Sequence, residues 1–578
     1  MENDFQEINK KRSKHLVALI FALAFGALLT APFIYSKFIA TEAKDIIPKI
    51  SSDQLFYEAR IKDVMDGYPW IGNAYIWEHK NSLSQQLFLT EFLLAQPLKF
   101  FHSSLFNGRI IYNLILPAVT FLLAYFAFYF VSKSQFFANL SAIFLFFGLF
   151  LFRFFQPISP QFNFIFWLSQ FIFLWLLIKK PKSTVIWLCN LFNFGLLFYV
   201  YTYYWTFYII LFAILAVVYF FNKNTRYLSL KILGIIGGGL ALGSFYFYQL
   251  YSASQLPEYL QALARIGMIN SHFPSGLKIV AVSAIVGLLF FICFRFKIIS
   301  LDKYSLFFAA GILTSVIAVN QHVITGRNLE FSSHYYMSAV FFGGFACAFL
   351  WVNFIKSFPR YLKVIKIPFL IVVILVVVLN LRNLPGIFSS VRSQATSNVR
   401  YSRVIKWINE NIKNESVVYA NENLSVLIPV YTKNDVFYER FANLFIMPDT
   451  EVLDRFILNN FFENFDENFV TQNYRSIFGV YYIDKFSHNQ SANKVKVLLG
   501  LKPEPAPLLP KEAVDKVITR ARQLQKKDFE SEISKYRVDY FVFDKKFDDW
   551  QLLKKKGFLS KVFENDDFII YEPMNRKS

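Results

Sequence analysis

Long apolar stretches recur along the first two thirds of this chain, separated by short polar turns. Until about Leu381, runs of roughly eighteen or more mostly apolar residues follow one another. Each run is long enough to cross, as a helix, a hydrocarbon layer of roughly 30 Å. We count eleven of them, at about 16–36, 110–131, 136–153, 163–179, 184–200, 204–221, 231–249, 278–295, 304–320, 335–355 and 365–382. The pattern therefore predicts a polytopic α-helical membrane protein with about eleven transmembrane helices.

Two longer regions interrupt or follow this pattern. The loop at 37–109 contains an apolar stretch at 85–101 that carries Glu91 and Lys99, which is typical of a helix lying in the membrane interface. From about Arg392 the composition becomes that of a soluble domain, with "YSRVIKWINENIKN" as an amphipathic helix and "VDYFVFDKKF" and "DDFIIYE" as strands. The predicted division is a terminal segment 1–15, a first helix 16–36, a large loop 37–109, a membrane body 110–391 of about ten helices, and an α/β domain 392–578.

The charge pattern predicts the orientation in the membrane. The chain has 60 Lys and Arg residues against 40 Asp and Glu, a net charge of +20. Most of the excess lies in the N-terminal segment and in alternate short turns, and cytoplasmic turns carry such an excess. We therefore expect a multi-pass protein of the cytoplasmic membrane, with the N-terminus inside and both the large loop and the C-terminal domain outside. The positive charge thus serves topology and gives no indication of nucleic acid binding.

The first dense group of charges follows directly after the first helix, in "SSDQLFYEARIKD" (51–63). Ser51 and Gln54 have the spacing of a capping box, which predicts a helix start there. On that helix Asp53, Tyr57 and Arg60 share one face. Two interpretations stay open for this stretch alone: a functional site, or an acid near a helix N-terminus beside a solvated Arg60.

Other predicted outer turns add polar residues at the same membrane surface. The turn 152–164 holds Gln156, and the turn 320–336 holds His322, Arg327, Glu330 and His334. Taken singly, each histidine is as well explained by a structural hydrogen bond, and the aromatic residues by interface belts. Taken together, they indicate an external site in which aromatic faces, carboxylates and a few cations bind a sugar and a lipid phosphate.

This pattern resembles the GT-C superfamily of membrane glycosyltransferases, which includes protein mannosyltransferases, aminoarabinose transferases and bacterial relatives. The resemblance rests on "SSDQLFYEARI" as the acidic motif of the first outer loop and on "WINENIKNESVVYANENLSVLIPVYTKNDVFYE" as the opening of an external domain. It implies transfer of a sugar, with inversion, from a polyprenyl-phosphate donor to a glycan, lipid or protein acceptor. Asp53 is then the catalytic base. The substrate-binding residues are then Tyr57, Arg60, Asp63, Gln156, His322, Arg327, Glu330 and His334.

The chain departs from this superfamily at one position. Many members carry two adjacent acids, whereas here Gln54 follows Asp53. A second acid would come from Glu58, Asp63, Asp66 or Glu330, so a divalent metal is possible but no cofactor is assigned.

Two further functions fit the same architecture. One is a non-catalytic scaffold or binding subunit of a surface-polymer assembly, and the other is a transporter of lipid-linked saccharides. The nearly uncharged span centres and the absence of a repeated half disfavour the transporter. An Asp53 locked in a helix cap would favour the scaffold, and an Asp53 lining an outer cavity would favour the enzyme.

Overall fold

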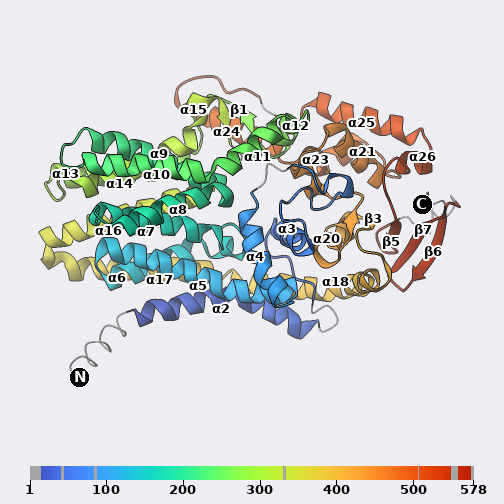
Figure 1. The fold of residues 1–578 in the computed structure, drawn as a ribbon, viewed down its shortest axis with the longest axis horizontal. Helices are drawn as coiled ribbons and strands as arrows, with labels where there is room; N and C mark the ends of the chain where they lie inside the picture. The colour runs from blue at the N-terminus through green and yellow to red at the C-terminus, as the bar shows by residue number, and fades with distance from the viewer. Residues whose placement is uncertain are drawn as a thin grey trace.

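The computed structural model describes residues 15–40, 45–83, 87–329, 334–505, 507–548 and 557–574. It consists of a bundle of apolar helices with a mixed helix-and-sheet region at one end (Figure 1). The N-terminal end of the described chain lies at the opposite end of the bundle from the C-terminal strands. The fold is therefore that of a helical membrane protein with a C-terminal α/β region, as the sequence predicted.

Within the described residues, seven helical segments are long and apolar enough to cross a membrane, and an eighth follows if a pair bent by 52° counts as one span. The seven are α2 (Leu16–Ile39), α5 (Leu105–Ser132), α9 (Thr202–Phe220), α13 (Leu277–Arg295), α14 (Lys303–Asn320), α16 (His334–Ser357) and Val364–Asn411, which runs through most of α17 (Leu362–Leu381) and α18 (Leu384–Asn411). The bent pair is α10 (Arg226–Leu242) and α11 (Ser244–Ser254). Three shorter apolar helices are Gln135–Leu149 (α6 with η3), α7 (Asn163–Lys179) and α8 (Thr184–Val200). Every predicted run thus coincides with a helix or a bent pair, and the number of spans stays a prediction.

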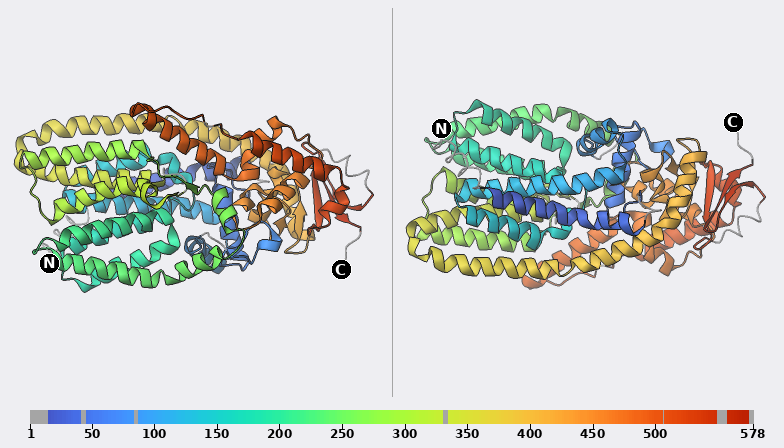
Figure 2. Two further views of the ribbon diagram at one scale, coloured as in Figure 1. Left: turned by 90° about the horizontal axis from the view of Figure 1, so that it is seen from above. Right: turned by 90° about the horizontal axis from the view of Figure 1, so that it is seen from below.

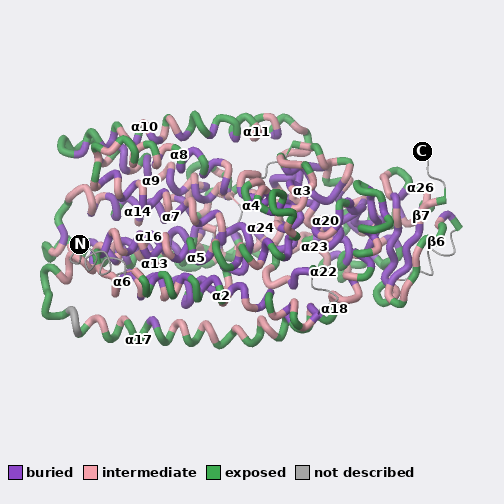
Figure 3. The backbone as a smooth tube through the Cα atoms, turned by 60° about the horizontal axis from the view of Figure 1, so that its bottom comes forward, coloured by how far each residue is buried: buried purple, intermediate pink, exposed green. Residues whose placement is uncertain are grey.

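Close helix approach holds the bundle together. A Cβ atom at Gly26 of α2 would lie 2.1 Å from the carbonyl oxygen of Leu114 in α5, so only glycine fits there. On the outside of the bundle, α17 runs along one edge and is largely exposed (Figure 3). Its exposed side chains include Ile371 and Leu375. Apolar side chains that face outward along a whole span are typical of a lipid-facing helix.

The large loop contains three short helices, α3 (Gln54–Asp66), η2 (Trp77–His79) and α4 (Leu89–Phe100). The predicted interfacial stretch corresponds to α4. Between spans, the connections include η4 (Leu151–Phe155), α12 (Tyr259–Arg265), α15 (His322–Thr325) and η5 (Pro359–Tyr361). Strands β1 (Ile269–Asn270) and β2 (Arg327–Asn328) pair antiparallel and join two of these connections.

The C-terminal region is built on a five-stranded sheet of order β4-β3-β5-β7-β6. Its strands are β3 (Val417–Tyr419), β4 (Asp435–Val436), β5 (Tyr540–Asp544), β6 (Leu559–Glu564) and β7 (Phe568–Pro573). Strand β3 pairs parallel with β4 and β5, and β7 pairs antiparallel with β5 and β6. The helices of this region after α18 are α19 (Glu422–Ser425), α20 (Ile428–Tyr431), η6 (Arg440–Leu444), α21 (Asp449–Asn459), α22 (Glu467–Gln472), α23 (Tyr474–Phe478), α24 (Tyr481–Leu498), α25 (Lys511–Gln525) and α26 (Phe529–Ile533).

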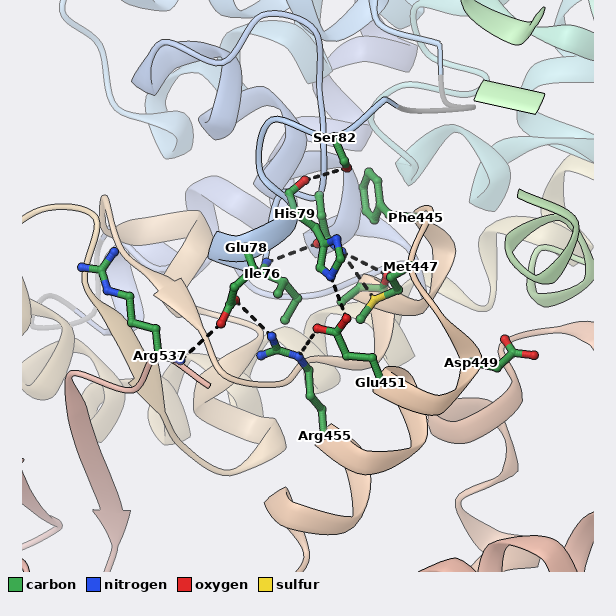
Figure 4. Close-up of polar contacts among 12 residues, drawn as sticks. Ile76, Glu78, His79, Ser82, Phe445, Met447, Asp449, Glu451, Arg455 and Arg537 are labelled. Atoms are coloured by element: carbon green, nitrogen blue, oxygen red, sulfur yellow. Dashed lines mark hydrogen bonds and ion pairs between the residues drawn. The ribbon is translucent and has the colours of Figure 1, made fainter. Parts of the chain in front are cut away.

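The large loop is tied to this region by partly buried polar contacts (Figure 4). His79 Nε2 lies 2.9 Å from Glu451 Oε2, and Arg455 bonds both Glu451 and Glu78, at 2.8 Å and 3.1 Å. In the backbone, the Val436 amide of β4 donates to the carbonyl of Tyr75. The loop and the C-terminal sheet therefore form one packed unit over the ends of the spans.

Candidate active site

A cavity of about 820 Å³ lies where the spans, the large loop and the C-terminal region meet. Its walls come from α3, α4, η4, the ends of α7 and α8, α9, α11, α12, the segment around β2, the start of α16, η6 and the turn between α23 and α24. Six predicted site residues line it: Asp53, Tyr57, Arg60, Gln156, Arg327 and His334. The structure thus brings together residues that are far apart in the sequence.

Asp53 is the N-cap residue of α3, yet its side chain makes no capping hydrogen bond. The predicted capping box does not form, because the Gln54 side chain instead accepts from the Ile50 amide and donates to the carbonyl of Pro48. Asp53 Oδ2 accepts a hydrogen bond of 3.1 Å from Gln156 Nε2. The carboxylate is thus half-buried on the cavity wall, oriented by an amide and not used to hold the helix end.

Arg60 lies on the cavity wall as part of a buried ion pair. Its Nη2 atom is 2.7 Å from Glu91 Oε1, and both side chains are less than 5 % exposed. Arg60 also donates to the carbonyl of Leu87 at 2.5 Å. Burial raises the pKa of Glu91, and the charge of Arg60 opposes this shift. The pair joins α3 to α4 and fixes the position of the helix that follows Asp53.

One side of the cavity is aromatic. His334 Nδ1 is 2.6 Å from the Tyr201 hydroxyl, and its ring stacks on that of Tyr203 with centroids 4.5 Å apart. Trp205 lines the cavity from the same helix, α9. Aromatic faces of this kind contact the apolar faces of sugar rings, while the histidine is oriented by its tyrosine partner.

Arginine dominates the charge of the cavity. The described lining residues include two acids, Asp53 and Glu91, and five arginines, Arg60, Arg153, Arg327, Arg440 and Arg475. After the Arg60–Glu91 pair is set aside, the described lining holds one acid, Asp53, and four arginines, of which Arg440 pairs with Glu422 at 3.7 Å. Guanidinium binds phosphate oxygens through two parallel hydrogen bonds, so this wall suits an anionic phosphate group.

Sequence reasoning missed several of these residues. Arg440 and Arg475 belong to the C-terminal region, and no spacing in the chain indicates that they approach Asp53. Arg153 lies in the same turn as Gln156, and this proximity is the signal in the sequence that points to it. The sequence indicates Glu91 only as part of an interfacial helix.

The remaining predicted site residues lie elsewhere or are not described. Asp63 is buried against Lys80, whose Nζ is 3.2 Å from Asp63 Oδ1 and 2.6 Å from Asp435 Oδ1. Lys80 thus links the face of α3 that carries Asp63 to β4, and Asp63 does not line the cavity. His322 is buried, with Nε2 2.7 Å from the carbonyl of Phe273, a structural contact outside the cavity. Glu330 lies outside the described residues.

A buried arginine outside the cavity holds part of its wall. Arg265 Nε donates to the carbonyl of Asn443 at 2.8 Å, and Nη2 donates to those of Phe445 and Met447 at 3.0 and 2.8 Å. Its Nη1 pairs with Asp449. The carbonyl of Arg265 accepts from the Val480 amide at 2.8 Å. One residue therefore fixes both cavity-lining segments of the C-terminal region, η6 and the turn before α24.

No protein-family model matches the chain, and no curated protein matches it. Among solved structures, the chain is similar to ArnT from Cupriavidus metallidurans in the apo state, at 11% identity over 95% of this chain and 97% of that chain, with a TM-score of 0.45. The same protein bound to undecaprenyl phosphate matches at 12% identity over the same shares, with a TM-score of 0.45. The apo oligosaccharyltransferase of Archaeoglobus fulgidus matches at 12% identity over 92% of this chain and 69% of that chain, with a TM-score of 0.44.

A likeness at this identity and TM-score assigns no residue role and no substrate. The roles proposed below therefore come from the cavity and its side chains alone.

The cavity offers no cluster of metal ligands in the described part of the chain. Among those residues, no group of three or more His, Cys, Asp and Glu side chains is placed to hold a metal ion. The two acids of the cavity differ in role, because Glu91 is committed to Arg60 while Asp53 accepts only from Gln156 among the contacts described. The described donor set of the cavity therefore does not form a divalent metal site, and no step below uses a metal.

Proposed function

We propose that this protein is a membrane glycosyltransferase that moves a sugar from a polyprenyl-phosphate donor to a hydroxyl acceptor, glycan, lipid or protein, at the outer face of the cytoplasmic membrane. The observation that carries the proposal is Asp53, a carboxylate on the wall of an arginine-rich cavity at the end of the spans. A volume of about 820 Å³ accommodates a sugar phosphate together with an acceptor group.

In this proposal Asp53 is the general base. Its carboxylate takes the proton of the acceptor hydroxyl, the acceptor oxygen forms a bond to the anomeric carbon, and the bond from that carbon to the phosphate oxygen breaks. The electron pair leaves with the lipid phosphate, and attack from the opposite face inverts the configuration. Gln156 holds one carboxylate oxygen, which leaves the other to accept the proton.

The arginines stabilise the leaving group. Arg153 and Arg327 are exposed on the cavity wall, and neither guanidinium bonds to another described residue. The donor phosphate is a diester with one negative charge and becomes a dianion as the bond to the sugar breaks, so guanidinium groups bind it more strongly in the transition state than in the donor. Tyr57 and the Tyr201–His334 pair are placed to contact the sugar.

The proposal includes the orientation deduced from the charge pattern. The N-terminus is cytoplasmic, and the loop 37–109 and the domain from about residue 392 lie outside, so that the cavity opens at headgroup depth. The scaffold alternative expects an Asp53 locked in a helix cap. The absence of a side-chain capping bond at Asp53 favours the enzyme over the scaffold.

Replacement of the carboxylate tests the proposal directly. The protein, reconstituted in liposomes with a panel of polyprenyl-phosphate sugars and acceptors, is assayed for release of polyprenyl phosphate. Asp53→Asn is expected to lower turnover by about 10²–10⁴-fold, the range for loss of a general base. Asp454→Asn, which removes a carboxylate from an ion pair outside the cavity, is the matched control and keeps full turnover. Equal turnover in Asp53→Asn and wild type would falsify the base assignment.

Cysteine accessibility tests the orientation. A cysteine placed at Ser52 is expected to react with a membrane-impermeant reagent added outside the cell. Reaction only after the membrane is made permeable would place Asp53 in the cytoplasm and remove the proposed function.

A further inference from the structure

Helix α24 leaves the C-terminal region and runs back along the long axis of the molecule, over the ends of the spans (Figure 2). Its packed side carries His488, whose Nε2 lies 2.6 Å from the Ser271 hydroxyl. Near its end, the Lys496 ammonium lies 5.8 Å from the ring centroid of Phe273. The helix is therefore fixed against the connection that leads into α13.

At the end of α24 and in the turn that follows it, four of five consecutive residues expose an apolar side chain. The exposed fractions are 59 % for Val497, 78 % for Leu498, 66 % for Leu499 and 54 % for Leu501. We call these four residues the apolar tip. Such a cluster is unusual on a surface that meets only water.

The apolar tip belongs to a closed turn. The Leu501 amide donates to the carbonyl of Lys496 at 2.8 Å, and Gly500 has φ +72°, which together give the 6→1 bond and left-handed residue of a Schellman cap. Beyond the cap, the side-chain amide of Asn493 exchanges two hydrogen bonds with the backbone of Glu504, at 2.7 and 3.0 Å. The four side chains are therefore held outward by a defined fold.

The height of the apolar tip follows from its neighbours. Phe273 lies four residues before α13 begins at Leu277, and the Ser275 amide donates at 2.8 Å to the side chain of Asn320, the last residue of α14. These contacts mark the level at which both spans end. Each residue of α24 beyond Lys496 moves about 1.5 Å further along the helix axis, and α24 points toward the spans (Figure 2). The apolar tip therefore lies at or just inside the boundary between headgroups and acyl chains.

The surroundings of the apolar tip match a lipid surface. Helix α13, which begins four residues after Phe273, also carries exposed apolar side chains, including Ile285 at 62 %. Two lysines, Lys494 and Lys502, flank the apolar tip, while Lys496 pairs with Glu504 at 2.9 Å. A few apolar side chains bordered by lysine are typical of segments that lie in the interface of an anionic membrane.

We propose that the apolar tip of α24 inserts into the same membrane leaflet that the spans enter beneath the C-terminal region. This contact anchors that region to the bilayer at a point far from the end of α17, where the chain leaves the last span. Because α24 begins just after Gly479 and Val480, which line the cavity, the anchor also fixes the height of that wall. The proposal does not depend on the chemistry assigned to the cavity.

Spin labelling in liposomes of phosphatidylethanolamine and phosphatidylglycerol tests the anchor. The label is attached to Leu498→Cys in a chain whose Cys189, Cys293 and Cys347 are replaced by Ala. Collision rates are then measured with oxygen, which concentrates in lipid, and with a nickel chelate, which stays in water. The control label is on Val562→Cys in β6, which is 41 % exposed at the far end of the sheet.

The expected result at Leu498 is collision with oxygen several-fold above that with nickel, and the reverse at Val562. High nickel collision at both sites overturns the proposal, because the apolar tip then meets only water. Low collision with both reagents at Leu498 also overturns it, because a second copy of the chain or another protein then covers the apolar tip.

If the cysteine-free chain does not fold, Leu498→Trp and Val562→Trp in the unaltered chain give the same decision by quenching with brominated lipids. Quenching of the added fluorescence in Leu498→Trp alone supports the anchor. Equal quenching or none in the two variants overturns it.

Discussion

Replacement of Arg265 by alanine gives the most direct measure of how the cavity wall is held. The guanidinium donates to three backbone carbonyls of the segment 443–447 and is itself only 4 % exposed. A buried acceptor that loses its donor costs about 1–3 kcal/mol. Three such acceptors set a loss of roughly 3 kcal/mol even at the lower limit. The pair with Asp449 adds little, because the Asp449 side chain is 57 % exposed.

Amide hydrogen exchange of the protein in lipid nanodiscs measures this loss at the segment itself. Two backbone hydrogen bonds report on η6: the Ala442 amide donates to the carbonyl of Glu439, and the Phe445 amide donates to the carbonyl of Ala442. Local opening exposes them, and about 3 kcal/mol corresponds to a roughly 100-fold faster exchange. Arg265→Lys keeps the charge but offers one compact donor in place of the planar fork, so its exchange rate is expected to lie between those of Arg265→Ala and wild type.

The matched control is Arg520→Ala. Arg520 forms a two-bond pair with Asp454, but its side chain is 38 % exposed and touches neither η6 nor Arg265. Its removal is expected to leave exchange at Ala442 and Phe445 unchanged. A factor of ten in exchange rate corresponds to about 1.4 kcal/mol of opening free energy. If the exchange rates in Arg265→Ala stay within about threefold of wild type, Arg265 does not hold the wall and the reasoning fails.

Two further substitutions test how the C-terminal region is held, at the contact of Gly479 with Arg265 and at the buried Asp63 beside Lys80. Gly479→Ala places a Cβ 2.3 Å from the carbonyl oxygen of Arg265 at a residue with φ +61°. The protein is therefore expected to unfold at a lower temperature, with a loss of about 1–3 kcal/mol in the free energy of unfolding. The control is Gly386→Ala, whose Cβ meets no atom within 4 Å, and equal unfolding temperatures of the two variants would contradict the argument. Burial raises the pKa of Asp63 to about 7 despite the opposing charge of Lys80, against about 3.9 in the unfolded chain. The stability that the protonated group contributes is therefore complete below about pH 4 and is lost as the pH rises through about 7. Asp63→Asn does not titrate, so its unfolding temperature relative to wild type is expected to rise between pH 5 and pH 8, and a constant or falling difference would refute the assignment.

The membrane body was predictable because lipid imposes a simple rule on sequence. A span has to be apolar along its whole length, so hydropathy alone located every helix of the bundle, including the bent pair α10 and α11. The start of α3 at Gln54 was also predictable from the polar residues before it. The capping box was wrong, since the Gln54 side chain satisfies the backbone of Ile50 and Pro48 instead.

The full composition of the cavity was not predictable, because long-range packing decides it. Helical spacing shows which residues share a face of α3, but not that Asp63 meets Asp435 across Lys80. Arg440 reaches the cavity on a segment held by Arg265, which bonds a carbonyl 178 residues away. No local pattern carries information about such a contact. Residues on the loop after the first span were therefore accessible to sequence reasoning, and those on the C-terminal wall were not.

The distance in sequence between the two sides of the cavity has a consequence for biosynthesis. Asp53 emerges from the ribosome early, and the segment that closes the chamber over it, from Arg440 to Val480, emerges near the end. Until then the carboxylate stands beside an unfinished pocket, with the guanidinium groups of Arg440 and Arg475 still unsynthesised. A product truncated before Arg440 would carry the whole helical bundle and only part of the cavity wall, so the proposed activity requires synthesis of the chain at least to Val480.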